Sequence, residues 1–428
     1  MITVGRGHAG TIDILEKEAA HVRHREDRGP CGERFTRRSV AECATKVAAI
    51  LFVCSLHPAD LDARNESRPR IDGDGTCLAE IVDGDSSLPV TETSSTDSGS
   101  FADAGSLSWP EGQKPSTTRY WASAAGGVKN YWNLFKPPNK WNKTSKTIDV
   151  FSLHVNYLTY DRPDVKNGMK QAVKFVSKKG LLLNVEAGGL RPFSGCDSMA
   201  GENHAALEWE NMSKWIALGG HINLITMDSA INTMMKNGDW GNCGWTIPKV
   251  ANELADYMKS IRQHLPDVEF GIIEPVPWYS VGQYPNHPGA NYGDFPTVLD
   301  TVLAVLEERG EELQFVYADS PYEYNESTVT QGWKKLAELE NYVHSVGLRF
   351  GLVFNSGVGG ETSGKLFYEH VMAGWPKYQA VGGNPDEIGV WSWYPNPKQN
   401  IPETKPYTFT YTCKKFFQQV DSSWTAAE

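Results

Sequence analysis

The sequence predicts a (β/α)8 barrel, and two observations lead to this prediction. Short aliphatic runs recur from residue 148 onward, and each is a strand candidate: 148–155, 180–189, 222–231, 268–279, 313–324, 349–357 and 388–397. Segments with helical spacing of apolar residues lie between these runs: 164–180, 204–220, 247–266, 295–313, 329–347 and 363–375. Nearly continuous apolar strands that alternate with helices indicate parallel strands covered by helices.

The number of repeats favours a closed barrel over an open doubly wound sheet. No GxGxxG or other Gly-rich phosphate motif follows any of the runs, which removes the usual reason for a nucleotide-binding sheet. Only seven strands are clear, so we expect the eighth within residues 117–127, or else an irregular barrel. Residues 404–420 are expected to form a closing helix or strand.

Residues 1–108 are predicted to be an N-terminal extension, and residues 109–428 the barrel domain. The stretch 46–63 contains an apolar run of about ten residues with basic residues before it, which fits a secretory signal and is too short to span a bilayer. A downstream start codon, a long basic leader or a short buried helix are the alternatives for this late position. Residues 90–108 are rich in Ser and Thr and are predicted to be a disordered linker. We therefore expect a secreted protein.

Composition narrows the classes of partner. The chain of 428 residues has a net charge of -11, which argues against nucleic acid or an anionic membrane as a partner and suits neutral or cationic ligands. Its 14 Trp and 17 Tyr residues exceed what a core of this size needs, so some are expected to stack on sugars. We expect a carbohydrate substrate, no cofactor, no transmembrane span and a monomer. Cys196 and Cys243 lie in polar Gly-rich loops, either as a disulfide or as two free thiols.

Polar residues follow the aliphatic runs at equivalent positions, where a parallel barrel opens into its active-site mouth. Four of them are acids: Glu186, Asp228, Glu274 and Asp319. Buried unpaired carboxylates are costly, and only Arg191 and His154 are cations in evident reach. Raised pKa values are therefore expected, as general acids require.

Paired carboxylates among aromatic residues are typical of glycoside hydrolysis. Glu274, in "IIEPVPWY", is the predicted acid/base, with Asp228 as its partner and Asp319 as a nearly equal choice. Glu186 is expected to orient the pair or to bind sugar hydroxyls. Trp391 and Trp393 alternate on one strand face, with Trp393 as a sugar platform and Trp391 in the core. The complete set of expected substrate contacts is Glu186, His154, Asn156, Trp278, Tyr279, Tyr324, Asn355 and Trp393.

Residues 117–415 resemble the (β/α)8 glycoside hydrolases. The resemblance lies in "NVEAGGL", "MDSAI", "IIEPVPWY" and "WSWYPNPKQNIPETKPYTFT". The broad retaining clan of these enzymes has an Asn-Glu pair after the fourth strand and a second Glu after the seventh. Here Ile273 precedes Glu274 and "VWSWYP" has Trp in place of a carboxylate, so the nucleophile of that clan has no counterpart.

Two other functions compete with hydrolysis. A metal-dependent sugar isomerase barrel would use the acids and His154 to hold Mg²⁺ or Mn²⁺, although no HxH or HExxH motif is present and no metal is predicted. A barrel that binds glycans without cleaving them would keep the aromatic cleft and lack a working acid pair. A serine nucleophile requires an elbow such as GxSxG, and "FNSGVGG" does not supply one, so Ser356 is expected to be a loop hydrogen-bonding residue.

Overall fold

The computed structural model describes residues 118–421, except 127, 129–130, 159–162, 191–195, 197–199 and 236–242. These residues belong to one compact unit, Gly99–Glu428. The predicted signal-like segment 46–63, the linker 90–108 and Arg191 lie outside the described residues. The boundary at residue 109 therefore stays a prediction.

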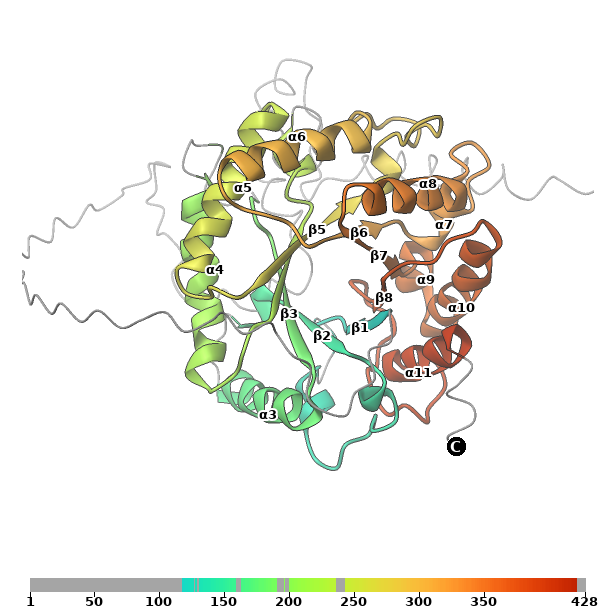
Figure 1. The fold of residues 1–428 in the computed structure, drawn as a ribbon. Helices are drawn as coiled ribbons and strands as arrows, with labels where there is room; N and C mark the ends of the chain where they lie inside the picture. The colour runs from blue at the N-terminus through green and yellow to red at the C-terminus, as the bar shows by residue number, and fades with distance from the viewer. Residues whose placement is uncertain are drawn as a thin grey trace, which may run out of the picture. The chain divides into compact units, whose positions relative to one another are not determined.

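Eight parallel strands close into a barrel in the order of the sequence (Figure 1). They are β1 Arg119–Ser123, β2 Val150–His154, β3 Leu182–Ala187, β4 Leu224–Asp228, β5 Glu269–Pro275, β6 Phe315–Asp319, β7 Arg349–Phe354 and β8 Glu387–Trp391. The predicted barrel is confirmed. Its eighth strand lies where we expected it, because β1 pairs with β2 on one side and with β8 on the other.

Helices follow the strands and surround the barrel (Figure 1). They are α3 Pro163–Lys179, α4 Ala200–Ala217, α5 Ile247–Arg262, α6 Phe295–Glu308, α7 Tyr322–Asn325, α8 Gly332–Ser345, α9 Gly357–Thr362, α10 Gly364–Ala380 and α11 Phe409–Val420. Short 3-10 segments add η2 Tyr131–Phe135, η3 Thr144–Lys146, η4 Val155–Leu158, η6 Asn232–Met234 and η7 Val276–Trp278. The C-terminal segment is thus a helix, whose apolar face includes Phe416 and Phe417. None of the helices in the described ranges is both long and apolar enough to cross a membrane.

Strand side chains divide into two cores because successive residues of a strand point to opposite faces. One core fills the barrel and contains Trp121, Ile273, Tyr317 and Trp391 among others. The other lies between the strands and the helices and contains the alternate residues of the same strands, such as Ile272 of β5. This alternation decides which strand-end residues face the mouth of the barrel.

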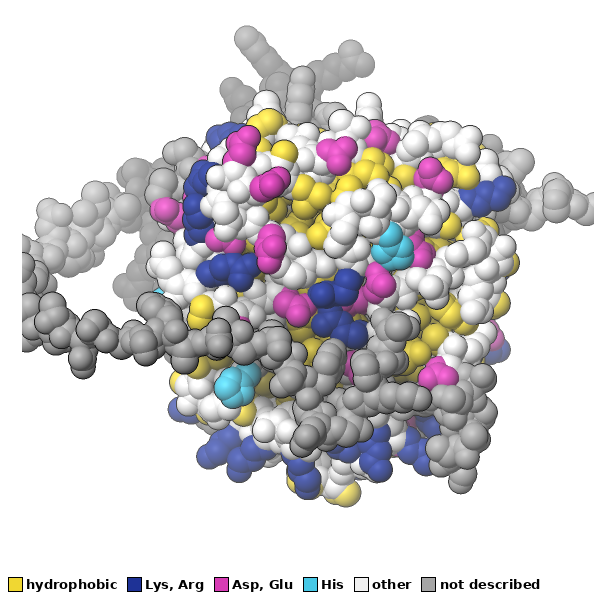
Figure 2. Space-filling view, in the orientation of Figure 1, with side chains coloured by type: hydrophobic (Ala, Val, Ile, Leu, Met, Phe, Trp, Pro, Cys, Tyr) yellow, Lys and Arg dark blue, Asp and Glu magenta, His cyan; other side chains and the backbone are white. Residues whose placement is uncertain are grey.

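Charged residues close the opposite end of the barrel. The buried carboxylate of Glu387 accepts hydrogen bonds from the guanidinium groups of Arg119 and Arg349, the latter at 2.8 Å. Arg119 also lies 3.5 Å from Glu269. Because each buried charge has a partner of opposite sign, the network seals the base without leaving an unpaired ion. The face in Figure 2 shows acidic and basic side chains interspersed near its centre.

Candidate functional site

The mouth lies at the carboxyl ends of the strands. The alternation that places Leu224, Tyr317 and Val353 inside the barrel also directs Asp228, Asp319 and Asn355 inward, further along the same strands. By the same rule Glu186 points inward from β3, and register pairs it with His154 at the end of β2. Five of the predicted site residues therefore share one region of the barrel.

Asp319 is the acid with the clearest electrostatic signature in the mouth. Its Oδ1 accepts a hydrogen bond of 3.2 Å from Asn355 Nδ2. Burial, then the nearby charge of Asp228, raises the pKa of Asp319 to about 7, despite the bond from Asn355. Both aspartates retain partly exposed surface, so a ligand can reach them. The two aspartates are therefore close enough to interact and can be reached by a ligand, and the pKa of one of them, Asp319, is raised.

Glu274 has the opposite orientation. Ile273 contributes to the core inside the barrel, so Glu274 belongs with Ile272 to the side that faces the helices. Its carboxylate accepts hydrogen bonds of 2.8 Å from the Ile231 backbone N–H and from the Tyr279 hydroxyl, and it has no exposed surface. Burial raises the pKa of Glu274 to about 8. The shift expected from the sequence is present, but the carboxyl group is enclosed behind β4 and β5 and is not brought into the mouth.

Tyr279 is enclosed with Glu274. Its ring packs edge-on against Tyr292 at 5.4 Å and Phe295 at 4.9 Å, next to α6, and is fully buried. The expectation that Tyr279 walls a sugar site is therefore corrected by its burial, since a ligand in the mouth has no surface of Tyr279 to touch. Its hydroxyl instead satisfies the Glu274 carboxylate.

Glu186 joins both tryptophans of the β8 end. Its two carboxylate oxygens accept hydrogen bonds from Trp391 Nε1 at 3.0 Å and Trp393 Nε1 at 2.8 Å. The two indoles stack at 6.2 Å, and Gly389 leaves the room that the Trp391 ring occupies. Trp391 is fully buried, as predicted, whereas Trp393 keeps partly exposed surface. Glu186 thus fixes the orientation of a partly exposed aromatic side chain.

Aromatic side chains from the segments that follow β5 and β6 also meet. Trp278 lies 5.3 Å from Tyr324 and 5.4 Å from His287, and all three rings are partly exposed. His154 accepts a hydrogen bond at Nδ1 from the backbone N–H of the exposed Asn156. The rings of Trp278 and Tyr324 form an edge-to-face pair, which is a rigid apolar surface of the kind that sugars stack on.

Tyr394 was missed by the sequence reasoning. Its side chain is partly exposed, and burial followed by the charges of Asp319 and Glu323 raises the pKa of its hydroxyl. A β-carbon on Gly357 would lie 3.1 Å from the Tyr394 hydroxyl and 2.7 Å from Glu323 Oε1, so both oxygens border the same small space. Tyr394 follows two tryptophans and a serine in a loop, and no periodicity marked it.

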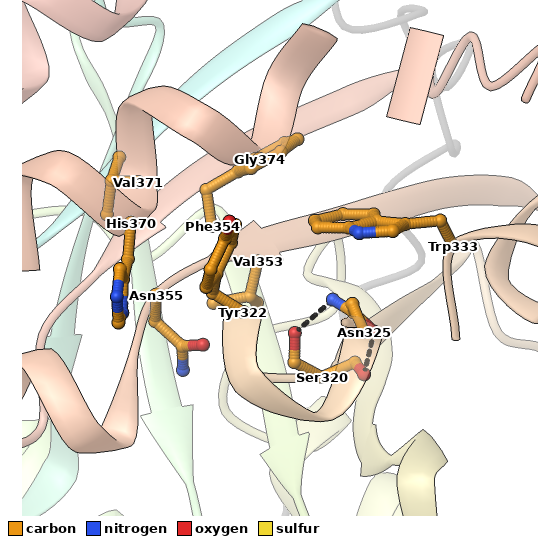
Figure 3. A pocket seen from close by; sticks show the side chains of 10 residues that line it. All are labelled: Ser320, Tyr322, Asn325, Trp333, Val353, Phe354, Asn355, His370, Val371 and Gly374. Carbon is orange, nitrogen blue, oxygen red and sulfur yellow. Dashed lines mark hydrogen bonds between the residues drawn. The ribbon is translucent and has the colours of Figure 1, made fainter. Parts of the chain in front are cut away.

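A small cavity of about 10 Å³ lies behind Asn355, enough for one water molecule (Figure 3). Polar side chains on its wall include Ser320, Asn325 and His370. Residues of α7, α8, α10 and the end of β7 complete the wall, and the cavity is far too small for a sugar. Ser356 is fully buried, and its hydroxyl lies 2.7 Å from His370 Nδ1 and accepts the Gly359 backbone N–H at the start of α9. The predicted role of Ser356 as a hydrogen-bonding loop residue is consistent with this position.

Cys196 and Cys243 form a disulfide. The bond joins the loop between β3 and α4 to the loop between β4 and α5, both on the mouth side of the barrel. In the described ranges, no group of three His, Cys, Asp or Glu side chains is placed so that it could hold a metal ion.

Comparison with known proteins finds similarity to solved structures of glycoside hydrolases. A Cellulomonas fimi endo-beta-1,4-mannanase double mutant is 11% identical, with a TM-score of 0.43, and the match covers 64% of this chain and 65% of the mannanase. A thermostable mutant xylanase from Cellvibrio japonicus is 14% identical, with a TM-score of 0.40, over 67% of this chain and 90% of the xylanase. A Thermotoga maritima beta-glucosidase is 12% identical, with a TM-score of 0.39, over 65% and 89% of the two chains. No protein-family model and no curated protein matches the chain.

Proposed function

We propose that the barrel is a glycoside hydrolase in which Asp319 and Asp228 form the acid pair. The observation that carries the proposal is the pKa of Asp319, raised to about 7 beside a second carboxyl group in the mouth. Glycoside hydrolysis requires two carboxyl groups, one on each side of the glycosidic bond, of which one is protonated and the other ionised. The role assigned to Glu274 from the sequence passes to Asp319, because Glu274 has no surface that a substrate can touch.

The reaction divides between the two aspartates. Asp319, protonated below about pH 7, donates its proton to the departing glycosidic oxygen as the bond from that oxygen to the anomeric carbon breaks. Asp228 then acts as a carboxylate, either by bonding to the anomeric carbon or by removing a proton from an attacking water. Water supplies the hydroxyl group of the new reducing end and releases one proton. If Asp228 has bonded to the anomeric carbon, Asp319 takes this proton from the water that displaces Asp228; if Asp228 has removed it from the attacking water, it returns to Asp319 through solvent.

Aromatic side chains supply the binding surface. Trp393, fixed by Glu186, and the edge-to-face pair Trp278 and Tyr324 expose apolar ring surface around the acid pair. Sugars present apolar C–H faces to such rings while their hydroxyls bind polar groups. Neutral glycans therefore fit the mouth better than small charged metabolites. We further propose that the protein is exported, which the disulfide between the mouth loops supports.

The decisive experiment measures the release of reducing ends from a panel of polysaccharides and aryl glycosides. Wild type is compared with Asp319→Asn, Asp228→Asn and the matched control Glu274→Gln. We expect both aspartate variants to lose at least about a thousandfold in rate and Glu274→Gln to keep most activity when folded. Activity that survives in Asp319→Asn but disappears in a folded Glu274→Gln would return the acid role to Glu274. Binding of glycans without turnover by all four proteins would make the barrel a carbohydrate-binding module.

A further inference from the structure

Helix α3 carries a stripe of lysines on an acidic protein. Lys166, Lys170, Lys174 and Lys178 follow each other at four-residue steps and are all exposed. Residues spaced by four lie on one side of a helix, about 6 Å apart along its axis. The four ammonium groups therefore form a line of positive charge on the outside of the barrel.

Two further lysines extend the line at the C-terminal end of α3. Lys179 donates a hydrogen bond of 2.7 Å to Asn142 Oδ1 and lies above the Phe175 ring, which stacks on Trp141 at 5.2 Å. This packing attaches the end of the helix to the segment that contains Lys146. Burial lowers the pKa of Lys179, and the charges of Lys146 and Lys178 lower it further. The lysine face comprises Lys146, Lys166, Lys170, Lys174, Lys178 and Lys179.

The stripe is not the arrangement that stability alone favours. Other helices of this protein pair opposite charges at the same spacing, as Glu210 with Lys214 in α4 and Lys365 with Glu369 in α10. The four stripe lysines instead make three successive like-charge neighbours, each unfavourable by a few tenths of a kcal/mol. Among the ion pairs between described residues, none involves a stripe lysine. Figure 2 shows basic side chains gathered along the lower edge of the molecule, over α3.

We propose that the lysine face binds an anionic polysaccharide, a chain of sugars that carry carboxylate groups. A line of charges about 18 Å long, from Lys166 to Lys178, matches an extended polyanion better than a single phosphate. Charge complementarity is the driving force, and the release of counterions makes the binding sensitive to salt. The net charge of -11 does not reveal this face, because it is a sum over the whole chain that includes the acids elsewhere.

Other polyanions fit the face less well. Basic helices that bind membranes insert large apolar side chains beside their lysines. On the described surface, however, the exposed large hydrophobic residues are Leu207, Val329, Val358 and Tyr407, none of them on α3. Proteins that read nucleic acid use arginine for bidentate contacts, whereas lysine is the only basic residue type in α3. Because α3 follows β2, it begins on the mouth side, so the stripe runs from the rim of the mouth toward the base.

The test uses the full chain and needs no turnover, so it is independent of the proposed hydrolase activity. Binding to immobilised polygalacturonate is measured at several NaCl concentrations for wild type, for the fourfold Lys→Gln variant at residues 166, 170, 174 and 178, and for a control. The control carries Lys→Gln at residues 249, 259, 334 and 398, so its net charge changes by the same amount. Glutamine preserves helix propensity, and both variants retain all other basic segments of the chain.

We expect wild type and control to bind polygalacturonate at about 50 mM NaCl and to release it as salt rises. The stripe variant should bind about tenfold or more weakly, with a smaller slope of log affinity against log salt. Equal binding by the stripe variant and the control would overturn the inference, as would failure of the wild type to bind. Tighter binding of the wild type to phosphatidylserine vesicles or to duplex DNA than to polygalacturonate would overturn it in favour of those partners.

Discussion

Asn355 donates a hydrogen bond from Nδ2 to Asp319 Oδ1 across 3.2 Å, from the end of β7 to the end of β6. The bond stabilises the ionised form of Asp319 and opposes the rise in its pKa that burial and Asp228 cause. The amide thus holds the carboxyl group in place and also adjusts the pH at which it loses its proton.

Replacement of Asn355 by Leu should raise the pKa of Asp319 further. Leucine has a similar size but no donor, so the carboxylate loses a stabilising bond. If Asp319 is the general acid, the alkaline limb of the kcat/KM profile against pH moves upward from about pH 7, by roughly half a unit to one unit. An unchanged alkaline limb with intact activity would separate Asp319 from the proton-donating step.

Glu274→Gln tests whether the buried carboxyl group affects stability. Folding raises the pKa of Glu274 to about 8, so between about pH 4.5 and 8 the folded state holds a proton that the unfolded state releases. The stabilising contribution of this proton is complete at low pH and is lost as the pH rises through 8. Relative to Glu274→Gln, the free energy of unfolding of wild type should fall by about 1.4 kcal/mol per pH unit in that window.

Urea unfolding at five pH values from about 5 to 9 measures this difference. The amide of the Glu274→Gln variant can accept the Ile231 N–H with its oxygen and donate to the Tyr279 hydroxyl with its nitrogen, so the variant is expected to fold. Parallel stability curves for the two proteins would contradict the raised pKa.

The sequence was sufficient to predict the barrel, but not to predict that Glu274, unlike Glu186, Asp228 and Asp319, lies on the side that faces the helices. Aliphatic runs and their spacing placed seven strands, and residues 117–127, where β1 lies, were one of the two possibilities for the eighth, beside an irregular barrel. Glu274 was misplaced because the run "FGIIEP" is apolar on both faces, as buried parallel strands are, so it contains no alternation to show which residues point inward. An error of one residue in the predicted direction of a strand moves every one of its side chains to the opposite face of the sheet.

Other features of the site depend on contacts between distant residues. Glu186 and Trp393 are 207 positions apart, and nothing local to either residue predicts that the indole N–H meets the carboxylate. The four-residue spacing of the α3 lysines, by contrast, is a local property of the sequence that the net charge does not reveal.

Glu186→Gln should impair the Trp393 platform more than the chemical step. In the wild type each carboxylate oxygen of Glu186 accepts one indole N–H. A glutamine side chain has only one accepting oxygen, so its NH2 group, which is a donor, would face the other indole N–H. We expect KM to rise about tenfold, with kcat changed less than about threefold, because in the proposed function Trp393 binds the sugar and does not react. Trp393→Phe, which keeps a ring but loses the bond to Glu186, should have a similar effect. Trp209→Phe serves as the control, because Trp209 lies in α4 and stacks on His264 of the segment after α5. A loss confined to kcat would assign Glu186 to the chemistry.

Burial of Lys335 should make stability depend on pH in the opposite direction from Glu274. Its buried ammonium group donates to the carbonyl oxygens of Tyr279 and Pro285, and burial lowers its pKa to about 8. Between about pH 8 and 10.5 the unfolded chain binds more protons than the folded one, so this group makes the protein more stable as pH rises. Lys335→Met should remove that slope. Urea unfolding of both proteins between about pH 8 and 10.5 measures the slope. An identical slope in the variant would contradict the lowered pKa of Lys335.

Tyr394→Phe tests whether the tyrosine that sequence reasoning missed contacts the substrate. The loop that carries it is fixed to α9, because Asn396 donates from its backbone and its side chain to the Gly360 carbonyl oxygen, at 3.0 and 2.9 Å. The hydroxyl is therefore held near Asp319 and Glu323, where a sugar hydroxyl can bridge them. Removal of the hydroxyl alone should lower kcat/KM about tenfold to a hundredfold, the usual effect of leaving a buried partner unpaired. Tyr407→Phe, in the same loop but exposed, should leave kcat/KM unchanged, and equal effects of the two substitutions would exclude Tyr394 from the site.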